Sequence, residues 1–211
     1  MMGIFTIGLI VVVGFTVLLN VLIARGRRKQ PPFDALLEDE RLANRARRRE
    51  IGPDVFVTPD LTNLPFDKHI GHAAVAEAAE AARAAASHPM ARFDGVANNY
   101  LKLMYGVANL DAIIEMEESC RRFITALIHW AEELTAIGDR PAAEVVLNET
   151  VRLRSDFAAG YIQLADIYAA RNDANALHEL RALITGGLFG HLPETQPKIL
   201  SHIDNHLRGV Q

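Results

Sequence analysis

The sequence has little cysteine: Cys120 is the only one among its 211 residues. A disulfide within the chain is therefore excluded, and this composition fits a reducing compartment. Cys120 also lies far from the N-terminus and from any long apolar run, so it is not placed as an acylated cysteine would be. We predict that it is a small buried side chain on a helix.

Common catalytic motifs are absent as well. The sequence contains no phosphate-binding glycine loop, no dinucleotide-binding glycine pattern and no nucleophile elbow. We therefore predict no catalytic residue, no cofactor and no enzyme activity. An enzyme whose site is spread over a helical domain is kept as an alternative hypothesis.

Charged side chains are missing from the first 24 residues. Within residues 3–24, Leu, Ile, Val and Phe dominate, and about 20 apolar residues suffice to cross roughly 30 Å of hydrocarbon as a helix. A cleaved signal peptide would have basic residues before a shorter apolar core and a small-x-small cleavage site, and none of these is present. Residues 3–24 are therefore predicted to span the lipid bilayer as an uncleaved helix.

Basic residues follow this apolar run directly. They are Arg25, Arg27, Arg28 and Lys29. Positive charges that flank a span stay on the cytoplasmic side of the membrane. The topology predicted from them has the N-terminus outside and the C-terminal domain in the cytoplasm.

The rest of the chain is acidic. Residues 1–29 carry four basic and no acidic side chains, so residues 30–211 carry 18 basic side chains against 26 acidic ones. Affinity for nucleic acid rests on neutralising phosphates with Lys and Arg. Nucleic acid is therefore not an expected partner.

Changes in composition divide the chain into residues 1–29 with the anchor and its basic flank, residues 30–66 as a juxtamembrane region, and residues 67–211 as a helical domain. Pro31 and Pro32 interrupt any helix that continues from the span. A short helix is predicted over residues 34–50. Residues 52–66 contain three prolines and many apolar side chains without a helical period, so we expect an extended segment that partly lies against the helical domain.

The helical domain shows helical periodicity throughout, which predicts an all-α fold. Helices are expected over residues 69–87, 90–106 and 109–137, from residue 139 or 140 onward, over residues 155–171 and 172–184, and around residues 199–207. Gly138 is placed to end the third of these helices, and Pro141 suits the first turn of the fourth.

Two stretches of this domain match each other at a constant offset of 34 residues. The first reads Leu127-x-x-Trp130-Ala131-x-x-Leu134 and the second Tyr161-x-x-Leu164-Ala165-x-x-Tyr168. The turn after the first is Gly138-Asp139, and the turn after the second is Asn172-Asp173. Ala143-x-x-x-Leu147 then opens the second helix of the first unit.

These residues resemble the tetratricopeptide repeat family, whose 34-residue unit is a helix-turn-helix with bulky-x-x-Leu-Gly-x-x-Tyr on its first helix and Ala-x-x-x-Phe on its second. The resemblance covers about residues 124–182 and implies an array of antiparallel helical hairpins. Ser155 departs from the family's usual proline, and the second unit's closing helix fits only after a one-residue shift. Generic helical-hairpin packing stays an alternative, and whether residues 69–106 form a further repeat stays open.

The resemblance also implies a partner-binding groove, because the first helices of such units line a concave surface. Mapped by the matched residues, it consists of Thr125, Ile128, Glu132, Thr135, Ala159, Ile162, Asp166 and Ala169. This face is apolar with acidic spots. It lacks the Lys and Asn residues with which some family members hold a C-terminal carboxylate, so a receptor of that kind is not expected. In the alternative interpretation, neighbouring helices simply cover the two isoleucines.

One group of residues is a candidate for metal binding. His202 and His206 are four residues apart and share one face of a helix, with Asp204 between them. A third firm ligand at a recognisable spacing is missing. We therefore predict a solvated polar face and no metal site.

Taken together, the sequence predicts a single-pass membrane protein whose cytoplasmic, tetratricopeptide-like domain binds protein partners at the membrane. A structural subunit of a larger membrane complex is a further alternative. Gly3, Gly8 and Gly14 lack the small-xxx-small spacing for close helix pairing, so nothing in the span favours it.

Overall fold

The computed structural model describes residues 33–93 and 95–209, and every regular element within them is helical. The predicted all-α fold is thereby confirmed. In chain order the elements are α2 (Phe33–Asn44), the 3-10 turn η1 (Pro53–Val55), α3 (Ala73–Ala86), α4 (Asn98–Tyr105), the 3-10 turn η2 (Val107–Asn109), α5 (Leu110–Ala136), α6 (Arg140–Arg152), α7 (Ala158–Ala170), α8 (Ala174–Leu183), the π-helical turn η3 (Ile184–Leu188) and α9 (Gln196–Gly209).

The predicted membrane anchor, residues 3–24, and its basic flank lie outside the described residues. Among the helices of residues 33–93 and 95–209, none combines the length and the apolar character that a bilayer span requires.

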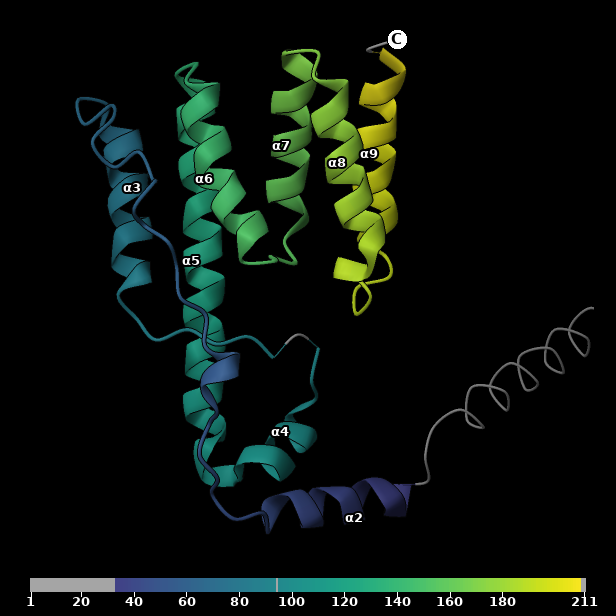
Figure 1. Cartoon of the computed structure of the whole chain (residues 1–211). Helices are drawn as coiled ribbons and strands as arrows, with labels where there is room; N and C mark the ends of the chain where they lie inside the picture. The colour runs from purple at the N-terminus through teal and green to yellow at the C-terminus, as the bar shows by residue number, and fades with distance from the viewer. Residues whose placement is uncertain (1–32, 94, 210–211) are drawn as a thin grey trace, which may run out of the picture.

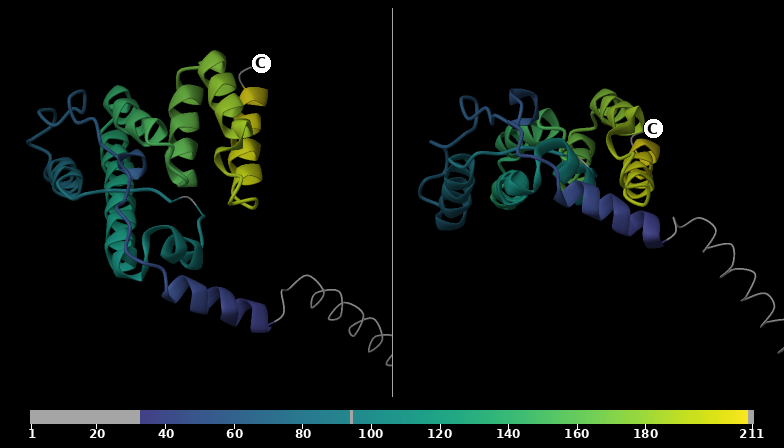
Figure 2. Two further views of the ribbon diagram at one scale, coloured as in Figure 1. Left: turned by 60° about the horizontal axis from the view of Figure 1, so that its bottom comes forward. Right: turned by 90° about the horizontal axis from the view of Figure 1, so that it is seen from below.

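Most helices of the domain stand side by side in a row. Figure 1 shows α3, α5, α6, α7, α8 and α9 following one another across the molecule, while α2 and α4 lie at the far end of α5. Seen from below, α6 and α8 lie on one side of the row and α5 and α9 on the other (Figure 2). This arrangement is compatible with a helical repeat. Because α3 packs on α5 and α4 packs on α2, residues 69–106 do not form a further hairpin of their own.

The two interhelical turns of the predicted repeat have the same geometry at an offset of 34 residues. Gly138 and Asn172 both adopt left-handed backbone conformations, with φ of 88° and 57°. The amides of Asp139 and Asp173, which follow them, each donate to the carbonyl five residues earlier at 2.9 Å. Each aspartate side chain then accepts from the amide three residues on, at 3.0 and 2.9 Å, and so caps its helix. Both α6 and α8 therefore begin in the same way.

The small residues of the motif lie where the helices approach each other. Ala131, Ala143 and Ala165 are completely buried. Large side chains of the motif fill the spaces between the helices and are also fully buried; they are Leu127, Trp130, Leu134, Leu147, Tyr161 and Leu164. Burying a side chain of this size stabilises the fold by about 1.5–3 kcal/mol.

The connecting segment, residues 52–66, is non-helical apart from η1, extended over residues 56–61 and turned over residues 62–64, and it lies against the helices, as the sequence predicts in outline. Phe66 stacks on Trp130 with ring centroids 4.8 Å apart. The Asp60 amide donates to the buried Glu149 carboxylate at 2.8 Å. The segment is therefore fastened both to α5 and to α6.

The helix predicted over residues 34–50 is wrong in its last six residues, because α2 ends at Asn44. The backbone beyond α2 is held instead by the turn that follows α4. The Arg49 amide donates to the Tyr105 carbonyl at 2.9 Å, and the Asn109 side chain donates to the Arg49 carbonyl at 2.6 Å. These long-range bonds replace helical ones.

The helix predicted over residues 90–106 is wrong in its first half. Its opening residues run extended beside η1 and the connecting segment, and only α4 is helical. The Val57 amide donates to the Met90 carbonyl at 2.9 Å, and the Arg92 amide donates to the Val55 carbonyl at 3.2 Å. Pairing with a distant segment overrides the helical spacing of the apolar residues here.

The end of the molecule that contains α2, α4 and the first turns of α5 is called the base here, and it has a small hydrophobic cluster of its own. It consists of Ala91, Phe93, Leu101, Tyr105 and Ile113. Lys102 of α4 also donates to the Asn44 side chain of α2 at 3.1 Å and pairs with Glu40. This ion pair lowers the pKa of Glu40 below its usual value. The first turns of α5 are thus joined to α4 and α2.

The Asp139 cap gives a prediction about stability. Its carboxylate accepts from His69 at 2.7 Å, and this bond, the capped amide and nearby Lys68 lower the pKa of Asp139. Replacement by Ala should cost about 1 kcal/mol of unfolding free energy in urea titrations at neutral pH. Asp139→Asn should cost less, because Asn still caps the helix.

The pH dependence of this contribution follows from the direction of the shift. An aspartate whose pKa is lower in the folded state stabilises the fold fully above its unfolded pKa, and the contribution is lost as the pH falls through the folded value. The stability difference between the wild type and Asp139→Ala should therefore shrink below about pH 4. A difference that is the same at pH 3 and pH 7 would contradict the assignment.

Candidate functional site

The predicted groove residues lie on α5 and α7. Of the eight, Thr125, Glu132, Thr135, Ala159 and Asp166 are exposed, Ile162 and Ala169 are half-buried, and Ile128 is buried. The exposed members therefore offer a surface, whereas the isoleucines contribute mainly to packing.

Ile128 is covered by the start of α7. A Cβ atom placed on Gly160 would lie 3.6 Å from the Ile128 side chain and 3.1 Å from the Thr150 hydroxyl. Gly160 thus allows α7 to approach α5 and α6 closely. This observation favours the alternative interpretation of Ile128 as a packing residue.

A shallow depression of about 390 Å³ lies between α5, the start of α6 and α7. Its lining consists of Glu132, Thr135, Ala136, Arg140, Gln163, Asp166 and Ile167. Three of these are predicted groove residues, and Gln163 donates to Glu132 at 3.0 Å across the two helices. The volume is within the range of small-ligand sites, but the depression is open rather than enclosed.

Two histidines of α9 converge on the groove residue Asp166. The Nε2 atoms of His202 and His206 each lie 2.7 Å from the Asp166 Oδ1 atom, and 3.2 Å from each other. Asp204, the acid considered from sequence, points elsewhere and pairs with Arg181 at 2.7 Å. The structure therefore brings together the two predicted histidines with a different carboxylate.

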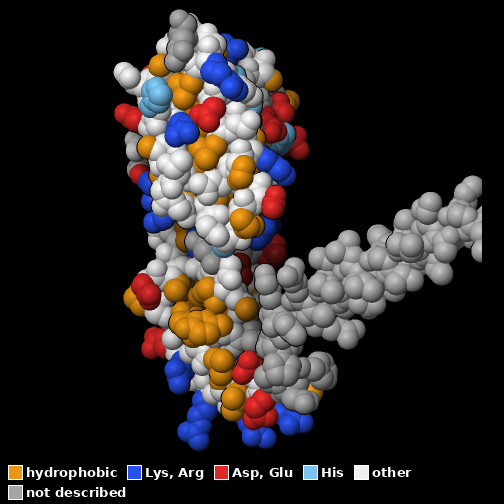
Figure 3. Space-filling view, turned by 90° about the vertical axis from the view of Figure 1, so that its right-hand side faces the viewer, with side chains coloured by type: hydrophobic (Ala, Val, Ile, Leu, Met, Phe, Trp, Pro, Cys, Tyr) orange, Lys and Arg blue, Asp and Glu red, His pale blue; other side chains and the backbone are white. Residues whose placement is uncertain are grey.

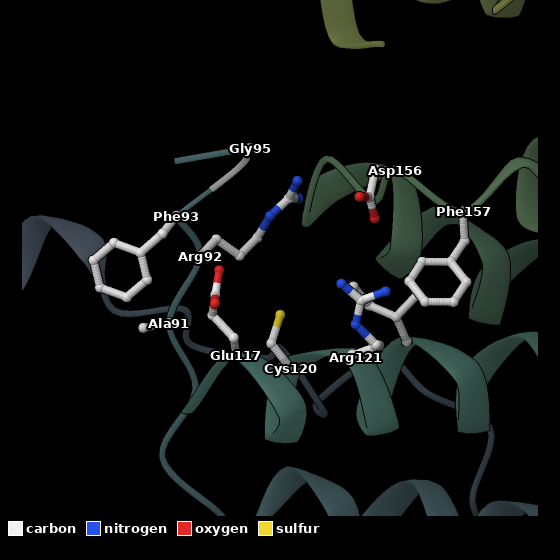
Figure 4. A pocket seen from close by; sticks show the side chains of 10 residues that line it. Ala91, Arg92, Phe93, Gly95, Glu117, Cys120, Arg121, Asp156 and Phe157 are labelled. Atoms are coloured by element: carbon white, nitrogen blue, oxygen red, sulfur yellow. The ribbon is translucent and has the colours of Figure 1, made fainter. Parts of the chain in front are cut away.

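A second, smaller cavity of about 70 Å³ lies between residues 91–93 with Gly95, α5 and the turn before α7. Figure 4 shows that Arg92, Arg121, Asp156 and Cys120 line it. The Arg92 guanidinium donates to two backbone carbonyls of the turn after α6. A cavity of this size has room for only a few water molecules, so it does not suit an organic substrate.

Cys120, which lines this cavity, is a buried residue of α5, as the sequence predicts. Sequence reasoning missed the contributions of Arg140 and Gln163 to the depression and of Asp166 to the histidine cluster. Asp166 precedes His202 by 36 residues, so no local spacing signals their contact.

Comparisons with protein families, with curated proteins and with solved structures find no match to this chain. The functional argument therefore depends on the geometry of the chain itself.

The positions of the groove residues predict unequal effects on stability. Ile128→Ala should lower the unfolding free energy by about 2–4 kcal/mol, because it leaves a cavity beneath α7. Thr125→Ala, at an exposed site on the same helix, should change it by less than about 0.5 kcal/mol. Urea unfolding of both variants measures this. Equal stabilities would show that Ile128 is not a packing residue.

Proposed function

We propose that this protein is a membrane-anchored interaction module, in which residues 3–24 span the bilayer and a tetratricopeptide-like helical domain binds a protein partner in the cytoplasm. The repeated turn geometry at an offset of 34 residues is the observation that carries this proposal. It supports two equivalent helical hairpins, α5–α6 and α7–α8, with α9 as a terminal helix.

The depression between α5 and α7 supports a partner-binding role. In helical repeat proteins, binding surfaces are made by the exposed faces of successive first helices. Here that face carries the carboxylates of Glu132 and Asp166, with Arg140 at its edge. A partner segment with basic side chains fits this charge better than an acidic one.

The base of the molecule supports an orientation with α2 and α4 toward the membrane. Residues 25–32 separate the apolar run from α2, and a stretch of this length reaches at most about 30 Å. Exposed apolar side chains gather at this end; they are Leu37, Leu42, Val96, Tyr100, Leu103, Met104 and Val107. In Figure 3, hydrophobic side chains cluster in the lower part of the molecule, with Lys and Arg side chains beneath them.

Arginines complete this surface. Arg45, Arg47, Arg48 and Arg49 follow α2, and all four are exposed. Basic residues close to an anionic membrane are each attracted by about 1 kcal/mol. Apolar and basic side chains at one end of a molecule are the combination expected of a region that rests on lipid headgroups.

A charge reversal in the depression tests partner binding. Crosslinking of the full-length protein in membranes, followed by identification of captured proteins, should recover a defined partner set. Glu132→Lys should reduce that recovery at least severalfold, because it reverses the charge facing the bound segment. Glu77→Lys, at an exposed glutamate of α3 outside the depression, is the matched control and should leave recovery unchanged. A partner set that survives Glu132→Lys would exclude this depression as the binding surface.

Carbonate extraction and protease protection test the anchor and its topology. The full-length protein should stay in the membrane fraction at alkaline pH, and protease outside intact cells should leave the helical domain intact. Changing Arg25, Arg27, Arg28 and Lys29 to Glu should invert the orientation of part of the population, because basic flanks determine orientation. Protease outside the cells should then digest the helical domain of these inverted molecules. Extraction of the wild type by carbonate would refute the anchor.

A further inference from the structure

The cluster of His202, His206 and Asp166 has the geometry of an incomplete coordination sphere. Its three ligand atoms, two imidazole Nε2 atoms and one carboxylate oxygen, all lie within 4.8 Å of one another. The imidazole rings are nearly perpendicular, with centroids 4.7 Å apart. Ligand atoms bound tetrahedrally to Zn²⁺ at about 2.0–2.1 Å lie about 3.3 Å apart. The two nitrogens are 3.2 Å apart, close to this value, whereas each lies 2.7 Å from the Asp166 oxygen, so the exposed carboxylate would have to move outward by roughly half an ångström to bind the ion.

Hydrogen bonding alone does not account for all three contacts. Each Nε2 atom carries at most one proton. If both imidazoles donate to the Asp166 oxygen, no proton is left for the contact between the two nitrogens. A cation at the centre would instead accept a lone pair from each of the three atoms.

The ligand types indicate which cation fits. Imidazole nitrogens suit Zn²⁺, Cu²⁺ and Ni²⁺, whereas Mg²⁺ and Ca²⁺ prefer spheres made of oxygen. The side chains of Asp166, His202 and His206 are 52%, 34% and 31% exposed, so a fourth position is open to water or to another ligand. Three protein ligands with one open position are a common arrangement for bound zinc.

We propose that Asp166, His202 and His206 form a binding site for a divalent first-row transition-metal ion, of which Zn²⁺ is the physiological candidate. The ion joins α9 to α7. Ile199 and Ile203 of α9 are already buried against the row of helices. The ion would add a polar link between α9 and α7 on the solvent-exposed side of this apolar contact. The assignment of this site rests on its own geometry and requires neither a bound partner nor the membrane anchor.

Calorimetric titration of the full-length protein in detergent, without a polyhistidine tag and after treatment with a chelator, tests the proposal. Zn²⁺ should bind with a stoichiometry of one and raise the unfolding temperature, because a ligand of the folded state stabilises it. Co²⁺ at the same site should give a visible ligand-field spectrum that Zn²⁺ abolishes. His206→Gln and Asp166→Asn should each weaken Zn²⁺ binding by at least tenfold, since even changes behind the ligands cost about 10–100-fold.

Asp204→Asn is the matched control, because Asp204 lies on the same helix between the histidines but pairs with Arg181. It should bind Zn²⁺ as the wild type does. Circular dichroism of each variant without metal verifies that the helices are intact. Absence of saturable binding, equal binding by His206→Gln, or loss of binding in Asp204→Asn would each overturn the assignment.

Discussion

The packing of α5 along its whole length is the constraint on which the rest of the structure depends. At 27 residues it is about 40 Å long, far longer than its neighbours. Its first turns carry Ile113 into the cluster at the base, and its later turns bury Phe123, Leu127 and Trp130 against α3, α6 and the connecting segment. One rigid helix therefore fixes the distance between the base, formed by α2 and α4, and the upper part of the row that contains α6 and α7 (Figure 1).

Features set by local sequence could be predicted, and features set by distant contacts could not. The turns at Gly138 and Asn172 follow from residues that tolerate left-handed backbone and from aspartates that cap the next helix, so their positions are readable in the sequence. The helix predicted from residue 90 failed because the backbone of this stretch bonds to distant residues, to Val55 and Val57 earlier in the chain and to Met116 later in it. Apolar spacing alone does not reveal such a partner.

The residues of the candidate site could likewise be predicted from the sequence only in part. The matched repeat placed Glu132 and Asp166 on an exposed face, where both line the depression, because position within a helical hairpin determines exposure. It placed Ile128 there too, although the absence of a side chain at Gly160 lets α7 cover it. The cluster around Asp166 depends on where α9 docks, and that docking follows from the burial of Ile203 rather than from any motif.

Asp166 belongs to both the depression and the histidine cluster, which couples the two electrostatically. Without a metal ion, the depression carries two carboxylates, Glu132 and Asp166, against the single guanidinium of Arg140. A divalent cation on Asp166 would reverse the sign of that local charge. In a site exposed on one side, such a change acts over several ångströms before salt screens it. A basic partner segment would then be favoured by the metal-free form and an acidic one by the metal-bound form, so metal occupancy and partner choice are physically linked.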